Sequence, residues 1–381
     1  MVQKLHMKCT GCNACKAVCK FDAISIISQE DGFWYPHIDE SKCTNCGECL
    51  RKCPVANTKD SNSYISDIYA AWNLDEKIRH ISSSGGIFSV IAENIIDNGG
   101  YVVGAAFNTN ITEVKHIIIN KKEDLALLRG SKYLQSYISE TIYKKVLELL
   151  KNGKCVLFSG TPCQVAGMKR FLQIDYKEFI TVDIICHGVP SPQVWQKYLE
   201  YMKKKYLEDI VNAQFRSKNH GWKKYEMELT FKTNHYSKWF IEDLYGKSFI
   251  NNMFLRECCY NCIYKSDKRE ADISLGDFWK APIKYDKDDK GTSLVIINSC
   301  KGREIFDEIK NRIFFEEILL EEAYPGNYAL YRSSGRFQER ERAFEMLKKK
   351  DFEQVINYYY GNSLMVRIRR KIHKIKQRLS E

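Results

Sequence analysis

The pattern of hydrophobic and polar positions divides the chain into three parts. In residues 1–58, short apolar runs are separated by cysteine-rich turns, and the polar stretch at 57–63 follows as a linker. From about Ile65, apolar segments of strand length alternate with segments of helical period. Beyond about Pro325 the chain is charged and helical, without a further strand signal. The pattern predicts domains at 1–58 and 65–325, followed by a helical basic tail at 326–381.

The central part alternates predicted strands and helices. Strands are expected at residues 101–107, 116–119, 156–159, 179–185, 227–231 and 294–298. Helices are expected at residues 86–98, 139–151, 164–172, 192–206 and 303–311. This alternation is typical of a mainly parallel or mixed sheet covered by helices. It predicts an α/β architecture for this part of the chain.

Composition changes this picture mainly through the cysteines. Hydrophobic residues make up 44% of the 381 positions, enough for a sizeable core, and no apolar run approaches the ~20 residues that span a bilayer. The 15 cysteines include several Cys-x-x-Cys pairs, and no export signal precedes the first cysteine, Cys9. This use of cysteine favours metal ligation over disulfides and predicts a reducing, cytoplasmic location.

The net charge of +11 is concentrated in the tail, where residues 365–381 hold seven Lys or Arg and one acid. The remainder is ordinary for a soluble protein, so nucleic acid is not predicted as a partner. Apolar residues recur there at helical spacing: Leu364, Ile368, Ile372, Ile375 and Leu379. A basic amphipathic helix of this kind fits an anionic membrane surface or an acidic partner. The alternative is a solvated terminal helix packed on its own domain.

A cysteine motif occurs twice near the N-terminus, 34 residues apart. The run Lys-Cys-Thr-x-Cys-x-x-Cys-x-x-x-Cys begins at Lys8 and again at Lys42. In ferredoxins with two clusters, the fourth cysteine of each run ligates the other 4Fe-4S cluster. The predicted ligands are therefore Cys9, Cys12, Cys15 and Cys53 for one cluster, and Cys43, Cys46, Cys49 and Cys19 for the other. The alternative, a pair of zinc sites, leaves two of the eight cysteines without a role.

A further group of cysteines lies in the central part. Cys163 opens a predicted helix directly after one strand, and Cys186 ends the next strand. Parallel strands joined by a crossover end at the same sheet edge, so these thiols are expected to meet there. Cys259 and Cys262 would complete the ligands of a third 4Fe-4S cluster. The alternative is a group of buried thiols with one zinc ion among them.

The remaining cysteines are assigned less specific roles. Cys155 and Cys300 lie in apolar strand or strand-end contexts and are expected in the core. Cys258 is either a neighbour of a ligand or a substitute for one.

Five ordered motifs accompany the cysteines. They are Ser83-Ser84-Gly85-Gly86-x-Phe88-Ser89, Gly130-Ser131-Lys132-Tyr133, Ser159-Gly160-Thr161-Pro162-Cys163-Gln164, Cys186-His187-Gly188-Val189-Pro190-Ser191 and Asp272-Ile273-x-x-Gly276-Asp277-Phe278-Trp279. With the two N-terminal runs, they resemble the beta-subunit family of deazaflavin-coenzyme (factor 420) hydrogenases and dehydrogenases over about residues 1 to 300. The resemblance implies an N-terminal two-cluster ferredoxin-like domain followed by a mixed-sheet α/β flavin-binding domain. The helical C-terminal tail falls outside the resemblance.

The same resemblance implies FAD and, commonly, a third 4Fe-4S cluster in the second domain. Ser83, Ser84, Gly85 and Gly86 precede a helix and could hold an FAD phosphate, although such residues also simply cap helices. Ser131, Lys132 and Tyr133 form a loop in which Lys132 could neutralise a phosphate or the N1 side of reduced flavin. The alternative for Lys132 is a solvated surface residue.

Two further residues are candidates by position. Asp277 follows a strand end and could shape the flavin pocket; otherwise its segment is a turn with an aromatic plug. His187 and Lys132 are the candidate catalytic residues, and His187, which adjoins a predicted ligand, could relay protons. A hydrogen-bonded structural histidine is the alternative interpretation of His187.

These features favour an iron–sulfur flavoprotein oxidoreductase, in which FAD exchanges hydride with a reduced coenzyme or substrate and the clusters carry single electrons. The alternative is an electron-transfer subunit that serves a partner enzyme without a substrate of its own. A structural metal module is the third and weakest hypothesis. The expected partner is a redox protein or a reduced coenzyme, and the expected location is cytoplasmic, with membrane association depending on the tail.

Overall fold

The computed structural model of the protein describes residues 5, 7–57 and 67–361. Most of the predicted linker at 57–63 lies outside the described residues, and so does the whole amphipathic segment from Leu364 to Leu379. In the described ranges, no helix combines the length and the hydrophobicity needed to cross a membrane.

Residues 7–57 form a small module, here called the ferredoxin-like module. Strand β1 (Ile24–Ser28) pairs antiparallel with β2 (Trp34–Ile38), so that Ile24 lies opposite Ile38. Two single-turn helices, α1 (Ala14–Ala17) and α2 (Glu48–Arg51), occupy equivalent positions in the two cysteine runs. The module's core consists of apolar side chains and thiols packed together. The duplicated sequence therefore produces a duplicated structure.

The second domain is built on a nine-stranded mixed sheet with the order β14-β3-β13-β12-β8-β7-β4-β5-β6. Its strands are β3 (Asp67–Asn73), β4 (Tyr101–Phe107), β5 (Val114–Ile119), β6 (Ser136–Tyr137), β7 (Val156–Gly160), β8 (Phe179–Ile184), β12 (Ile273–Asp277), β13 (Ser293–Ile297) and β14 (Ile313–Glu317). The central strands β4, β7, β8 and β12 are parallel to their neighbours in that set. The mixed sheet expected from the alternating pattern is confirmed.

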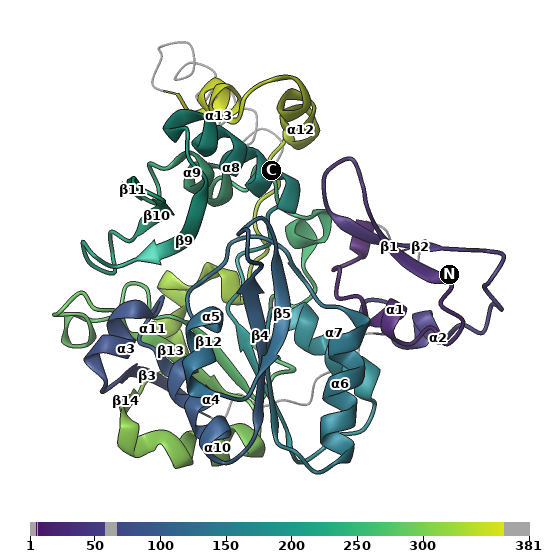
Figure 1. The fold of residues 1–381 in the computed structure, drawn as a ribbon. Helices are drawn as coiled ribbons and strands as arrows, with labels where there is room; N and C mark the ends of the chain where they lie inside the picture. The colour runs from purple at the N-terminus through teal and green to yellow at the C-terminus, as the bar shows by residue number, and fades with distance from the viewer. Residues whose placement is uncertain (1–4, 6, 58–66, 362–381) are drawn as a thin grey trace.

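Helices cover both faces of this sheet (Figure 1). One face packs against α4 (Ile87–Asp97) and α10 (Cys300–Ile309), the other against α6 (Glu140–Lys151) and α7 (Pro162–Leu172). Neighbouring strand residues such as Val102 and Val103 contribute to opposite faces, as the two-residue period of a strand requires. Helix α1 of the ferredoxin-like module packs on α6 and α7, which fixes the module to this side of the sheet.

A second, three-stranded antiparallel sheet has the order β11-β10-β9. It consists of β9 (Ile210–Ser217), β10 (Glu226–Phe231) and β11 (His235–Trp239), and its core is shared with α8 (Pro192–Tyr206), α9 (Leu244–Ile250), α12 (Arg340–Lys349) and α13 (Phe352–Tyr360). Figure 1 shows this sheet and the last two helices at one end of the large sheet. Shorter helices are α3 (Glu76–Ile81), α5 (Leu125–Leu128) and α11 (Leu320–Ala323). Helices at the C-terminal end agree with the predicted fold class.

Candidate functional site

The first predicted ligand set, Cys9, Cys12, Cys15 and Cys53, is called the first thiol set. Burial, together with the thiolates of Cys53 and Cys9, raises the pKa of Cys12 to about 12. Burial also raises the pKa of Cys15, with added contributions from Cys12, Cys9 and Cys53 and a smaller one from Cys49 of the second set. Thiols act on one another in this way only at short range. The fourth cysteine of the second run therefore lies among the first three cysteines of the first run.

The second thiol set, Cys19, Cys43, Cys46 and Cys49, lines a cavity of about 220 Å³. Phe21, Ile24, Ile38 and Leu50 complete its apolar walls. The backbone amide of Ala23 donates to the sulfur of Cys19 over 3.3 Å. Cys46 is exposed, whereas Cys12, Cys15 and Cys53 of the first set are buried. The second set thus lies at the surface of the module and the first lies on its inner side.

The third thiol set consists of Cys163, Cys186, Cys259 and Cys262. Cys163 lies in the first turn of α7, after β7, and Cys186 follows the end of β8, so the parallel crossover brings them to one sheet edge. Burial raises the pKa of Cys163 well above its ordinary value, and Cys262, Cys186 and Cys259 raise it further. Burial likewise raises the pKa of Cys186 to about 12. The structure brings all four predicted thiols together.

The other cysteines fall outside these sets. Cys258 lies against Cys259, so its two alternative roles stay open. Cys155 is half-buried and packs against the sheet core. The expectation that Cys300 is a core residue is wrong: it is exposed, because it occupies the first position of α10 rather than the end of a strand. All fifteen cysteines are unpaired.

The surroundings of the thiol sets suit 4Fe-4S clusters. The buried hydroxyl of Tyr264 has no hydrogen-bond partner within the described protein, and it lies near both Cys163 and Cys12. Buried hydroxyls normally have a partner, and cluster sulfur atoms accept hydrogen bonds. In the described ranges, no three Cys, His, Asp or Glu side chains are placed to hold one metal ion. A 4Fe-4S cluster instead binds each thiolate to a different iron atom. The residues present fit such clusters.

Helix α7 joins the first and third thiol sets. Cys163 lies in its first turn, and Gly167 lies one turn later against Cys12. A Cβ atom at Gly167 would stand 2.7 Å from the Cβ and 2.9 Å from the Sγ of Cys12. The hydroxyl of Tyr143 donates to the Cys12 carbonyl over 2.6 Å, and Tyr143 also lies near Cys163. The two sets are therefore neighbours across a single helix.

The predicted flavin contacts meet at one sheet edge. The Ser131 amide donates to the Ser83 hydroxyl oxygen over 2.7 Å, and the two hydroxyl oxygens are 2.9 Å apart. Gly86 is the N-cap of α4, with a φ of 84° that favours glycine. The Gly85 amide donates to Ser293 and the Ser84 hydroxyl donates to the Thr292 carbonyl, so both anchor the turn to the sheet.

Lys132 bends back onto the end of α5. Its Nζ donates to the carbonyls of Leu128, Arg129 and Gly130 at 3.3, 2.9 and 3.2 Å. Burial lowers the pKa of Lys132 to about 7. Lys132 is thus not a solvated surface residue, because its ammonium group lies among backbone carbonyls.

Two basic residues of β9 and its following turn join this edge, and the sequence had not singled them out. Arg216 donates to both carboxylate oxygens of Asp277 at 2.7 and 2.9 Å, and to the hydroxyl of Tyr133 at 3.3 Å. The Nζ of Lys218 donates to the carbonyls of Arg79, Ser84 and Lys290 at 2.6, 2.9 and 2.7 Å. Burial lowers the pKa of Lys218 to about 7. Only a prediction of β9 could have drawn attention to them.

The segment around Asp277 contains the aromatic plug that was its alternative interpretation. Trp222 donates to Asp277 over 2.9 Å, and Trp279 stacks on Trp222 with ring centroids 4.4 Å apart. Phe278 is fully buried in the core, as an aromatic plug would be. A role for Asp277 in binding flavin stays a prediction.

His187 follows Cys186 and is half-buried. Its Nε2 lies 2.6 Å from the Asn252 side-chain oxygen, and its ring lies 4.9 Å from that of Phe249. Burial lowers the pKa of His187. These contacts suit the structural alternative, and the proton-relay role stays a prediction.

Comparison with known protein families matches three segments of the chain, which lie within residues 8–322. Residues 8–57 match the 4Fe-4S dicluster domain. Residues 68–142 match the N-terminal part, and residues 153–322 the C-terminal part, of the coenzyme F420 hydrogenase/dehydrogenase beta subunit.

Individual relatives were also found. A subunit of the F(420)H(2) dehydrogenase of Methanosarcina mazei is 22% identical over 332 residues, which cover 84% of this chain and 86% of that protein. A subunit of the Na(+)-translocating ferredoxin:NAD(+) oxidoreductase complex of Acetobacterium woodii is 54% identical over 46 residues, or 12% of this chain and 13% of that protein. A chain from the F420-reducing NiFe hydrogenase complex of Methanosarcina barkeri is 17% identical, with a TM-score of 0.49 over 79% of this chain and 94% of that chain.

Proposed function

Since the chain belongs to the family of coenzyme F420 hydrogenase/dehydrogenase beta subunits and is an iron–sulfur oxidoreductase, we propose that it is also a flavoprotein that binds FAD. In this proposal, the three thiol sets hold 4Fe-4S clusters, and residues 83–86 and 131–133 contact the flavin. FAD supplies a group that takes up an electron pair as hydride and exchanges single electrons with clusters. The hydride donor or acceptor is a reduced coenzyme or substrate.

The flavin proposal depends on one observation: the buried Lys218 and the half-buried Lys132 lie at the predicted contact edge without carboxylate partners among the described residues. Lys132 and Lys218 donate to backbone carbonyls, and neither forms an ion pair within the described residues. Lys218 donates a hydrogen bond to the Ser84 carbonyl, and Lys132 follows Ser131, which is hydrogen-bonded to Ser83. Buried charge without a counter-ion is costly. A diphosphate, or the anionic N1 side of reduced flavin, would supply the missing negative charge.

The arrangement of the sets supports a route for electrons. The third set lies at the same sheet edge as the predicted flavin contacts, because β7, β8 and β12 all end there. The first set adjoins the third across α7, and the second set is the most exposed. Electrons would therefore pass between the flavin edge and the surface through the third, first and second sets in that order.

A redox partner protein is expected at the outer end of this route. The M. mazei relative is named as a subunit of a dehydrogenase, and the A. woodii relative as a subunit of a complex. Phe21, which is 49% exposed, lines the cavity of the second set and offers apolar surface beside the exposed Cys46. A cytoplasmic location remains a proposal. A membrane contact is a separate proposal, which depends on the residues after 361.

The test is anaerobic purification with iron, sulfide and flavin measured per chain. We expect about twelve iron atoms, for three clusters, and one FAD. Cys163→Ser should reduce the iron to about eight per chain. Cys300→Ser is the matched control, since this exposed thiol lies outside all three sets and its loss should leave the iron content unchanged.

The outcomes separate the candidate functions. A flavin absorption band that is bleached by a reduced small-molecule donor supports the flavoprotein. Cluster absorption without any flavin would instead favour the electron-transfer subunit that has no substrate of its own. Equal iron content in Cys163→Ser and wild-type protein would contradict the third cluster.

A further inference from the structure

Arg256 lies between the ferredoxin-like module and the third thiol set, and it is 0% exposed. Its backbone is tied to the third set, because the Cys259 amide donates to the Arg256 carbonyl over 2.8 Å. Its amide donates in turn to the carbonyl of Val189, three residues after Cys186. The side chain extends in the opposite direction, into the module.

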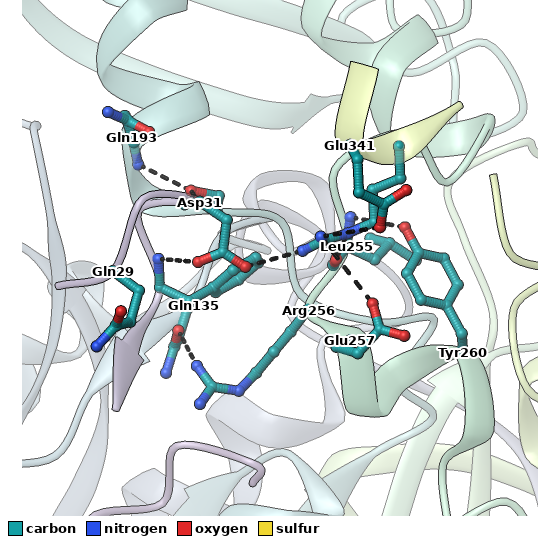
Figure 2. A network of polar contacts seen from close by, with 12 residues as sticks. Gln29, Asp31, Gln135, Gln193, Leu255, Arg256, Glu257, Tyr260 and Glu341 are labelled. Atoms are coloured by element: carbon teal, nitrogen blue, oxygen red, sulfur yellow. Dashed lines mark hydrogen bonds and ion pairs between the residues drawn. The ribbon is translucent and has the colours of Figure 1, made fainter. Parts of the chain in front are cut away.

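The guanidinium group meets the first thiol set directly. Its Nε donates to the Cys9 carbonyl over 2.7 Å, and its Nη2 lies 3.5 Å from the Cys9 sulfur. Nη2 also donates to the Trp34 carbonyl over 3.0 Å. Nη1 donates to the side-chain oxygen of Gln135 over 3.0 Å, a contact that Figure 2 shows. The ring of Tyr35 lies 4.1 Å from the guanidinium carbon. These contacts hold the group in one orientation.

None of these partners is a carboxylate, and within the described residues Arg256 forms no ion pair. The carboxylates drawn near it in Figure 2 are engaged elsewhere. Asp31 pairs with Arg340 over 3.0 Å, and Glu257 pairs with Arg336. A buried arginine that lacks a counter-ion is strongly unfavourable. The negative charge that balances it would come from the Cys9 thiolate and from a cluster that this thiolate holds.

We propose that Arg256 is the buried counter-charge of the cluster held by the first thiol set and that it raises the reduction potential of this cluster. A 4Fe-4S core with four thiolates carries net negative charge and gains one more electron on reduction. A fixed positive charge near a ligand sulfur stabilises the reduced form more than the oxidised form. A hydrogen bond to that sulfur acts in the same direction. The proposal rests on cluster binding by the first set and is independent of flavin.

The packing around Arg256 shows why the site accepts it. Gly11, between Cys9 and Cys12, has a φ of 71°, and a Cβ there would lie 2.3 Å from Gln135 Nε2 and 3.1 Å from the guanidinium carbon of Arg256. The loop of the first cysteine run can thus close on the guanidinium only with glycine at this position. The charge is held against the loop and cannot move away from the sulfur.

Arg51 provides a matched control near the second thiol set. Its Nη2 donates to the Cys46 carbonyl over 2.8 Å, as Arg256 donates to that of Cys9. However, Arg51 is 59% exposed and pairs with Glu48 over 2.6 Å. Solvent and the carboxylate screen its charge. Its removal should therefore change cluster potentials much less than removal of Arg256.

The experiment measures cluster midpoint potentials by EPR-monitored redox titration of the anaerobic full-length protein, with iron counted in each sample. The signal of the first-set cluster is the one lost in Cys12→Ser. Arg256→Met should shift this potential to more negative values, with a smaller shift in the same direction for the third-set cluster. Arg256→Lys, which keeps the charge, should restore most of the first-set potential. Arg51→Met should shift the second-set potential much less than Arg256→Met shifts the first-set potential. An unchanged first-set potential in Arg256→Met with full iron would overturn the proposal.

Loss of the cluster is also informative. If Arg256→Met loses about four iron atoms and Arg256→Lys retains them, the charge is needed for binding, as proposed. If both variants lose the cluster, the guanidinium geometry rather than the charge is required, and the proposal is wrong. Neither readout involves flavin, so failure of the FAD assignment would be recognised separately, by the absence of flavin from wild-type protein.

Discussion

At the scale of single residues, burial changes the pKa of several side chains at the predicted flavin edge. Lys132 and Lys218 belong to a residue type that is normally solvated and charged. Burial among carbonyls lowers the pKa of each to about 7. His116, a titratable neighbour of Lys132, has a pKa lowered by burial to about 4, so it stays neutral near pH 7. The two lysines are therefore groups at this edge whose charge changes near neutral pH.

This predicts how FAD binding depends on pH. A bound anion raises the pKa of Lys132 above its flavin-free value of about 7, because opposite charge favours the protonated amine. Affinity is then greatest and level below about pH 7, and it decreases as the pH rises from 7 towards the raised pKa. Fluorescence titration of flavin-depleted protein with FAD, repeated across this pH range, measures the affinity.

Lys132→Met should bind FAD about tenfold to a hundredfold more weakly at low pH and lose part of the pH dependence, with Lys218 supplying the rest. Lys122→Met is the control, since Lys122 pairs with Asp97 at the surface over 2.6 Å. Wild-type affinity of Lys132→Met at every pH would contradict this role.

At the scale of elements, helix α7 has the greatest influence on the site. Thr161 and Gln164 form a capping box, in which the Thr161 amide donates to Gln164 over 3.0 Å, and Pro162 occupies the first helical turn. These residues fix where the helix starts, and so they fix where Cys163 lies relative to the sheet edge. One turn later, Gly167 allows Cys12 to approach the helix.

At the same scale, the two cysteine runs give a prediction that tests whether they exchange their fourth ligands. Cys12→Ser and Cys53→Ser should each lose about four iron atoms, and because both belong to one set the double variant should lose no more. Combining Cys53→Ser with Cys46→Ser should remove about eight, because two sets are broken. Iron analysis of the anaerobic variants measures both.

The comparison between these pairs controls for general damage to the module. If Cys12→Ser with Cys53→Ser lost about eight iron atoms while Cys53→Ser with Cys46→Ser lost about four, Cys53 would belong to the cluster of its own run. The proximity of Cys53 to Cys12 argues for the exchanged arrangement.

At the scale of the whole molecule, the thiol sets differ in their depth below the surface. The ferredoxin-like module is fixed to the second domain by Asn13, whose side chain donates to the Ile138 carbonyl over 3.1 Å, and by Ser191, which donates to the Asp31 carbonyl over 2.6 Å. This docking covers the first set and leaves Cys46 of the second set exposed. Electrons from a large partner can therefore enter most directly at the second set.

The same difference predicts the order of oxidative damage. Peroxide should destroy the second-set cluster several times faster than the first-set cluster, because solvent reaches Cys46 but not Cys12 or Cys15. EPR spectra of samples quenched over time measure the two losses. Cys46→Ser, which lacks the second cluster, should lose the fast phase. Equal rates for both clusters would contradict the inferred depths.

The sequence predicted the elements whose own residues decide their structure. Strands such as β4 and β7 are continuous apolar runs, and helices such as α6 and α8 have a clear apolar stripe. Strands β9 and β14 were missed because exposed or half-buried positions interrupt their patterns. Only their pairing within a sheet makes them strands. Arg216 and Lys218 were missed with β9.

What the sequence determined alone was the grouping of twelve cysteines into three predicted thiol sets. Motif spacing assigned the first two sets, and the parallel crossover rule brought Cys163 and Cys186 to one edge, because each depends on a short stretch of chain or on a general topology. The tertiary structure alone decided what lies between the sets. Arg256 meets Cys9, and Gly167 meets Cys12, across more than a hundred residues of sequence. Such contacts depend on how whole layers pack, and no local pattern records that.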